Sequence, residues 1–279
     1  MASVALGTKS VGSIVKLNES GKAVNYLVVH QGKPSSIYDE SCNGTWLLRQ
    51  DLIENRVWDD GNVNKLESSD IQPWLNGTML GKYDANIQAA IKQVKIPYRK
   101  NGGSGGTDQT GANGLSCKVF LLSGREVGFT DNESAYFPND GAKLTYFESG
   151  NGSSAQQKRI AKLNGSATRW WLRSPYANST YYVFYVLSNG VWYNNSASRS
   201  YGVRPVLNFS SCLLVSWLDG EDEGGKDESD RKEERWGAYI AYLEGWSKDN
   251  AETGCYGLSP LGFDEWLEEK CEEDEDDVE

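Results

Sequence analysis

The pattern of apolar and polar positions predicts β-strands along much of the chain. Residues 12–31, GSIVKLNESGKAVNYLVVHQ, read as a hairpin in which a Glu-Ser-Gly turn joins two strands. A strand is expected in residues 117–129, CKVFLLSGREVGF. In residues 182–193, an Asn-Gly turn separates two runs rich in aromatic and β-branched residues, which is typical of a second hairpin.

Two segments carry a helical period instead. Residues 71–80, IQPWLNGTML, have a proline in the first turn, where its missing N–H is harmless. Residues 84–94, DANIQAAIKQV, place four apolar side chains on one helical face, and Pro97 is expected to end that helix. Residues 101–114 are rich in glycine and read as a flexible loop, and residues 131–156 read largely as polar turns. Together these elements predict an α+β fold with many loops.

Charge divides the chain into two parts. Residues 1–218 hold 22 Lys and Arg against 16 Asp and Glu, whereas residues 219–279 hold 6 against 23. The second part opens on a polar, charged stretch that has almost no apolar residue to bury. We therefore predict a folded domain over residues 1–212, followed by an acidic linker and short helical tail over residues 213–279.

Composition also narrows the class of protein. No run of eighteen apolar residues is present, which predicts no membrane span, and the start of the chain lacks the pattern of a secretory signal. The sequence therefore favours synthesis in the cytoplasm without a signal peptide. A nucleic-acid partner is not expected, because the basic excess of the first part is small and forms no Lys/Arg run.

Signals for catalysis are few. The chain has one histidine, His30, which ends an apolar strand and favours a structural role. The glycines at residues 102–106 lack the Lys-Ser/Thr ending of a phosphate-binding loop, and no His and carboxylate cluster has metal-ligand spacing. Five cysteines at wide, irregular spacings fit neither a disulfide framework nor a zinc site. We expect no enzyme activity, no metal and no cofactor.

The most unusual composition lies in residues 176–201. Of these 26 residues, eight are aromatic, nine are Ser or Asn, and one, Arg199, is charged. Antibody binding loops favour the same mixture, because Tyr and Trp give large contact areas while Ser and Asn give short, adaptable hydrogen bonds. The alternative is that these residues form an ordinary aromatic core. Because the aromatic residues at 181, 182, 184 and 185 must point to both faces of a strand, we favour a binding surface.

Two signatures flank this stretch. RWWLRSP, residues 169–175, and GVRPVLNF, residues 202–209, each read as a buried strand that contains an arginine. A buried guanidinium needs an internal carboxylate or carbonyl partner. We therefore expect Arg173 and Arg204 to have such partners and to hold the intervening strands and loops at a fixed separation.

These motifs, together with ALGTKSVGSIVKL, TWLLRQD, IQAAIKQVKIPYR and GANGLSCKVFLLSGREVG, resemble the variable proteins of diversity-generating retroelements of gut bacteria and their phages. The resemblance covers residues 5–209. It implies a C-type lectin-like fold of the formylglycine-generating-enzyme subclass, with a variable region at about residues 170–205. In that family a reverse transcriptase rewrites adenine-containing codons, so a fixed scaffold displays a hypervariable surface that binds a protein or glycan ligand.

Read onto this sequence, the resemblance implies two sets of residues. The scaffold positions correspond to Trp170, Trp171, Arg173, Gly202, Arg204 and Pro205. The candidate variable, ligand-binding positions are the polar and aromatic residues between them: Asn178, Thr180, Tyr181, Tyr182, Phe184, Tyr185, Leu187, Ser188, Asn189, Trp192, Tyr193, Asn194, Asn195, Ser198, Arg199 and Ser200.

Two alternatives stay open at this stage. The chain could be a structural or assembly protein of a phage particle with a fixed surface, and the acidic tail could dock on a phage virion or partner protein, or only solubilise the chain. The fold subclass also suggests formylglycine generation, but that chemistry needs paired reactive cysteines or a copper-thiolate site, and the sequence places no pair of cysteines near the GVRP signature.

Overall fold

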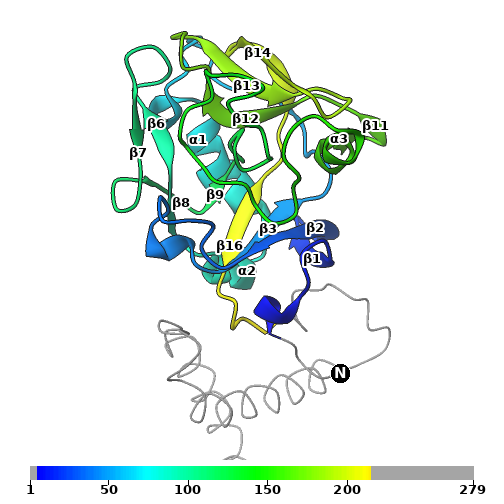
Figure 1. Ribbon diagram of the computed structural model, residues 1–279. Coiled ribbons are helices and arrows are strands. Elements are labelled where there is room, and N and C mark those ends of the chain that lie inside the picture. The colour runs from blue at the N-terminus through cyan, green and yellow to red at the C-terminus, as the bar shows by residue number, and fades with distance from the viewer. Residues whose placement is uncertain (1–4, 215–279) are drawn as a thin grey trace, which may run out of the picture. The chain divides into compact units, whose positions relative to one another are not determined.

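The computed structural model describes residues 5–214 (Figure 1). Within this range the chain forms two five-stranded sheets, three two-stranded ladders and a few short helices. Most of the strand pairs are antiparallel, and the α+β class predicted from the apolar pattern is confirmed. The acidic linker and helical tail predicted over residues 213–279 lie outside the described residues, apart from Leu213 and Leu214.

The first sheet has the strand order β1-β2-β3-β16-β9 and is antiparallel throughout. Its strands are β1 (Ile14–Glu19), β2 (Lys22–Gln31), β3 (Thr45–Arg49), β16 (Val206–Phe209) and β9 (Val119–Phe120). The predicted hairpin at residues 12–31 is confirmed, and Ser20 and Gly21 form its turn with positive φ angles.

The second sheet has the order β14-β13-β12-β15-β4 and occupies the upper part of Figure 1. Its strands are β14 (Trp192–Ser196), β13 (Tyr182–Val186), β12 (Trp170–Pro175), β15 (Ser200–Gly202) and β4 (Asn55–Val57). Only the β12–β15 pair is parallel. The chain leaves this sheet at β15 and enters the first sheet at β16, so the GVRP signature spans the crossing between the two sheets.

Short helices and ladders complete the fold. The helices are η1 (Leu6–Thr8), η2 (Glu40–Cys42), η3 (Leu66–Ser68), α1 (Ile71–Trp74), η4 (Leu75–Met79), η5 (Leu80–Lys82), α2 (Ala85–Ala90) and α3 (Ser153–Arg159). The ladders pair β5 (Val94–Ile96) with β8 (Leu115–Cys117), β6 (Tyr98–Lys100) with β7 (Thr107–Gln109), and β10 (Lys162–Leu163) with β11 (Ser166–Ala167). The helix predicted at residues 71–80 is confirmed, and its turns continue to Lys82.

The structure differs from four local predictions. The helix predicted over residues 84–94 ends at Ala90, since Ile91 bridges to Phe209 and the Lys92 N–H donates to the Asn208 carbonyl. The strand predicted over residues 117–129 is short, because the chain turns after β9. The glycine-rich segment contains β7, and α3 lies partly in the segment read as polar turns.

The central strands of the second sheet, β12 and β13, are buried on both faces. Val183 and Tyr185 of β13 pack into one hydrophobic cluster, whereas Phe184 and Val186 pack into another. Strand β12 alternates in the same way, with Trp171 on one side of the sheet. The adjacent aromatic residues of β13 therefore face two cores, rather than one core and solvent.

Candidate ligand-binding surface

The candidate surface is built on the hairpin of β13 and β14. Val183 pairs with Asn195, and Tyr185 pairs with Tyr193. Gly190, in the connecting loop, has a φ of +84° and lies so close to α3 that an added Cβ would come within 2.2 Å of the Gln156 carbonyl oxygen. The Asn-Gly turn predicted from the sequence is therefore fixed by its own backbone conformation and by packing against a helix.

Most of the candidate variable residues reach solvent. Tyr181 is 41% exposed and Tyr193 is 56% exposed. The other exposed candidates are Asn178, Thr180, Ser188, Asn189, Ser198, Arg199 and Ser200. The half-buried candidates are Tyr182, Leu187, Trp192, Asn194 and Asn195. These residues lie on the hairpin and on the loops at its two ends.

Phe184 and Tyr185 differ from the other candidates because they are buried in the core, at 0% and 3% exposure. The Phe184 ring stacks on Phe137 with centroids 3.9 Å apart, and Tyr185 packs edge-on against Trp171 at 5.8 Å. As folded, neither side chain is placed to contact a ligand. Trp192 is intermediate, since its ring also packs against Phe184 at 5.6 Å.

All six scaffold positions are buried. The indole N–H of Trp170 donates to the Arg159 carbonyl, and that of Trp171 donates to the Arg56 carbonyl, both at 3.0 Å. Gly202 lies beside Leu52, where an added Cβ would come within 2.3 Å of the leucine side chain. These residues define the sheet on which the candidate surface stands.

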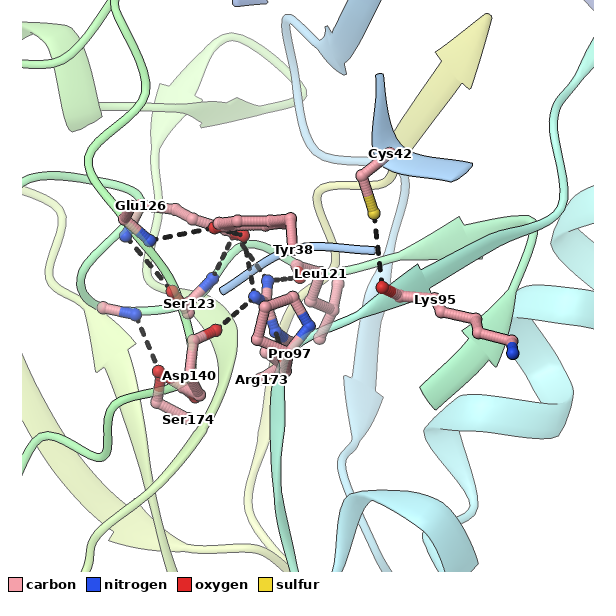
Figure 2. Close-up of polar contacts among 12 residues, drawn as sticks. Tyr38, Cys42, Lys95, Pro97, Leu121, Ser123, Glu126, Asp140, Arg173 and Ser174 are labelled. Carbon is pink, nitrogen blue, oxygen red and sulfur yellow. Dashed lines mark hydrogen bonds and ion pairs between the residues drawn. The ribbon is translucent and has the colours of Figure 1, made fainter. Parts of the chain in front are cut away.

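Arg173 of β12 lies in a buried polar cluster (Figure 2). Its guanidinium forms a bidentate ion pair with Glu126, and both side chains are fully buried. The same carboxylate accepts from the Tyr38 hydroxyl and the Ser123 N–H. Burial lowers the pKa of Arg173, but Glu126 outweighs this effect and raises it overall. The carboxylate partner expected for Arg173 is confirmed.

Arg204 is held differently. Its Nε and Nη2 donate to the carbonyl oxygens of Arg49 and Gln50, each at 3.0 Å, and its guanidinium lies 5.2 Å from the Trp170 ring centroid. The Nη1 atom is buried without a hydrogen-bond partner in the described part of the chain. Burial lowers the pKa of Arg204 to about 10. The carbonyl partners expected for this arginine are confirmed.

Asn64, which the sequence analysis missed, clamps the turn at residues 176–182. Its side-chain amide donates to the carbonyls of Ser179 and Tyr182, at 2.9 and 2.8 Å, and its backbone N–H donates to the Thr180 carbonyl. Its amide oxygen accepts from the Gly103 N–H. Asn64 is 1% exposed, so these bonds are shielded from water.

The glycine-rich segment forms the second half of this clamp. The Ser104 N–H donates to the Ser179 carbonyl. An added Cβ at Gly103 would come within 2.1 Å of the carbonyl oxygens of both Tyr176 and Ser179. Only glycine permits so close an approach. The segment interpreted as a flexible loop is therefore packed against the candidate surface, and a glycine run alone gave no signal of this contact.

Arg159 of α3 holds the other end of the hairpin. Its Nη1 donates to the Gly190 carbonyl at 3.3 Å, and its Nε donates to the Val127 carbonyl at 2.7 Å. Its guanidinium lies 4.0 Å from the Phe129 ring centroid. At both ends of the hairpin, residues outside the variable region thus bind backbone carbonyls rather than side chains of the candidate positions.

The histidine and the two free cysteines, which are the side chains that could take part in catalysis, pack within the fold. Nδ1 of His30 lies 2.7 Å from the Thr145 hydroxyl, and burial lowers the pKa of this histidine. Cys42 and Cys117 are free and buried, and burial raises the pKa of each thiol to about 12. Among residues 5–214, no group of three His, Cys, Asp or Glu side chains is arranged to hold a metal ion. In the same range, no helix is long and apolar enough to cross a membrane.

The fold and site define an α+β domain whose aromatic hairpin is held by buried arginines and by contacts to its backbone. Residues 43–211, more than half of the chain, match the family described as Domain of unknown function (DUF6273), and the chain belongs to that family. The match includes the whole candidate surface and its clamps. No curated protein and no solved structure gives a significant match to the chain.

Proposed function

We propose that this chain is the variable protein of a diversity-generating retroelement, and that it displays a diversified surface that binds a protein or glycan ligand. The scaffold would be C-type lectin-like, of the formylglycine-generating-enzyme subclass. The α+β class and the sequence motifs quoted above support this scaffold. The chain acts by binding in this proposal and needs no cofactor.

One observation carries the proposal: the segment richest in Tyr, Asn and Ser is held by its backbone. Asn64 binds three carbonyls of the turn and the Gly103 N–H, and no side chain of Asn178, Thr180 or Tyr181 takes part. Changes at those positions would leave the clamp in place. A surface that must accept many different side chains without refolding requires this kind of support.

The chemistry of the surface suits recognition of an uncharged or weakly charged ligand. Tyr181 and Tyr193 offer large rings that lose little conformational entropy on binding, and the surrounding Asn and Ser residues add short hydrogen-bonding groups. Arg199 is the one charged candidate. Affinity would therefore come from aromatic contact and hydrogen bonding, with small dependence on salt.

Sequencing of the codons for residues 165–210 across a natural population tests diversification. We expect substitutions at codons of the exposed candidates, traceable to adenines in a nearby template copy, and none at the codons for Phe184, Tyr185 or the scaffold positions. Uniformly low variation across the segment would contradict the proposal and favour a fixed role, such as assembly of a phage particle.

Binding is tested separately with arrays of glycans and of surface proteins from gut bacteria. The wild-type chain is compared with a Tyr181→Ser/Tyr193→Ser variant, which removes the two most exposed rings of the hairpin. We expect a ligand retained by the wild-type chain and lost by the variant at unchanged stability. Equal binding by both chains would place the contact elsewhere.

A further inference from the structure

The ion pair between Arg173 and Glu126 is complete without the side chain of Asp140. Arg173 has five N–H donors. They are all used: two by the Glu126 carboxylate and one each by the carbonyls of Pro97, Leu121 and Asp140. The charges of the arginine and the glutamate cancel. No donor of the guanidinium is left for the carboxyl group of Asp140.

The Asp140 side chain is buried and poorly satisfied. The residue is 1% exposed, and its Oδ2 accepts one hydrogen bond, from the Ser174 hydroxyl at 2.7 Å. Its Oδ1 is buried and has no hydrogen-bond partner among residues 5–214. An ionised carboxylate in this position would be an uncompensated buried charge, which is far costlier than a neutral carboxyl group.

The charged groups around Asp140 do not supply the missing compensation. Arg173 lowers its pKa, but that charge is already shared with Glu126, and Glu126 and Asp108 both raise the pKa. Asp108 is in turn paired with Arg99 at 2.9 Å. Burial is the largest effect, and the pKa of Asp140 rises to about 7.

The segment that ends at Asp140 supports the candidate surface. The Ala177 N–H donates to the Tyr136 carbonyl at 3.0 Å, and the rings of Tyr136 and Tyr176 lie 4.8 Å apart. Phe137 stacks beneath Phe184 of β13. Ser174, the hydrogen-bond donor to Asp140, directly precedes the last residue of β12. Any displacement of Asp140 would therefore reach the turn at residues 176–182.

We propose that Asp140 is a proton-binding site of the folded domain, and that loss of its proton loosens residues 136–140 beneath the ligand-binding surface. The protonated carboxyl group fits the neutral pocket that the ion pair leaves. The ionised group would draw water or new donors toward Oδ1 and weaken the bond between Ala177 and Tyr136. The regulatory part rests on the proposed function, whereas the proton site itself does not.

The direction of the pH effect follows from the pKa difference. The pKa of an aspartate is about 3.9 in an unfolded chain, and the pKa of Asp140 in the folded domain is raised to about 7. Between these values the folded domain holds a proton that the unfolded chain has released. The stability contributed by Asp140 is therefore full below about pH 4 and is lost as the pH rises through about 7.

Carboxyl NMR of the full chain, labelled with ¹³C at aspartate, measures the proton site directly. Asp140 is expected to titrate near pH 7. Amide exchange measured in parallel should show that the protection factor of the Ala177 N–H falls between pH 6 and pH 8. The Gly190 N–H, bonded to the Leu187 carbonyl at the other end of the hairpin, is the internal control.

Two variants make the test specific. Asp140→Asn keeps the shape and removes the titration, so the fall in Ala177 protection should disappear. Ser174→Ala removes a hydrogen bond that lowers the pKa, so the titration midpoint of Asp140 should move upward. An Asp140 midpoint below pH 5 in the wild-type chain, or an unchanged pH effect in a folded Asp140→Asn variant, overturns the proposal. Because no readout uses a ligand, failure here leaves the proposed ligand binding untouched, and absence of ligand leaves the proton site standing.

Discussion

Strand β12 and the turn that follows it are neighbours in sequence but are held by different atoms. In β12, the side chains make the contacts: Trp170 and Trp171 donate through their indoles, and Arg173 binds Glu126. In the turn at residues 176–182, the carbonyls make most of the contacts, and Asn64 supplies the partners. The difference separates residues that specify the fold from residues that can change without altering it.

Loss of Arg173 is the change with the largest expected effect. Arg173→Met would leave Glu126 buried without its partner, so the free energy of unfolding should fall by about 3–5 kcal/mol. Urea unfolding of the purified chain measures this loss. The matched control is the double variant Arg173→Met/Glu126→Gln, which removes both charges and should recover part of the stability. A loss below about 1 kcal/mol in the single variant would show that β12 does not depend on this side chain.

Loss of the turn's clamp should have a smaller effect. Asn64→Ala leaves the carbonyls of Ser179 and Tyr182 without their amide donor, and leaves the Gly103 N–H without its acceptor. We expect the free energy of unfolding to fall by about 1–3 kcal/mol. Hydrogen exchange should also show lower protection of the Ser104 N–H, which is bonded to the same turn, while the protection of amides in β2 changes little.

Libraries of randomised variants test whether the Asn64 clamp lets the turn accept different side chains and still fold. Residues 178, 180 and 181 are randomised in the wild-type and Asn64→Ala chains, and folded variants are counted by resistance to protease. A control library randomises Ser188 and Asn189, which lie at the end held by Arg159. We expect the Asn64→Ala background to reduce the folded fraction of the first library far more than that of the second. An equal reduction would mean that Asn64 contributes only general stability.

Local patterns were enough to predict several parts of the structure. The hairpin at residues 12–31 follows from alternation and a Ser-Gly turn, and the need of a buried guanidinium for a partner follows from its desolvation. The sequence pattern could not identify which residue is the partner of Arg173. Glu126 lies 47 residues before Arg173, in the part of the predicted strand that follows β9 and is not a strand.

The missed features share a cause, since they depend on which segments pack together. Asn64 binds the Ser179 carbonyl 115 residues away, and neither residue type marks such a contact in the sequence. Adjacent aromatic residues in β13 suggested an exposed face, but hydrophobic clusters cover both faces of this strand. Exposure of an aromatic residue is thus a property of the sheet's position in the fold, which strand alternation alone does not reveal.

Replacement of an exposed ring on the hairpin should have the smallest effect on stability. Tyr193→Ser removes a side chain that is 56% exposed and whose ring centroid lies 6.1 Å from that of Tyr185. The free energy of unfolding should therefore fall by less than about 1 kcal/mol. The matched control is Tyr185→Ser, one strand away and paired with Tyr193 in the sheet. That buried ring packs against Trp171 and Tyr201, and its loss should cost about 3–5 kcal/mol. Equal losses from the two tyrosines, measured by urea unfolding, would show that Tyr193 specifies the fold as β12 does. A much larger loss from Tyr185→Ser than from Tyr193→Ser would show that, of these two paired tyrosines, one belongs to the scaffold and the other to the surface.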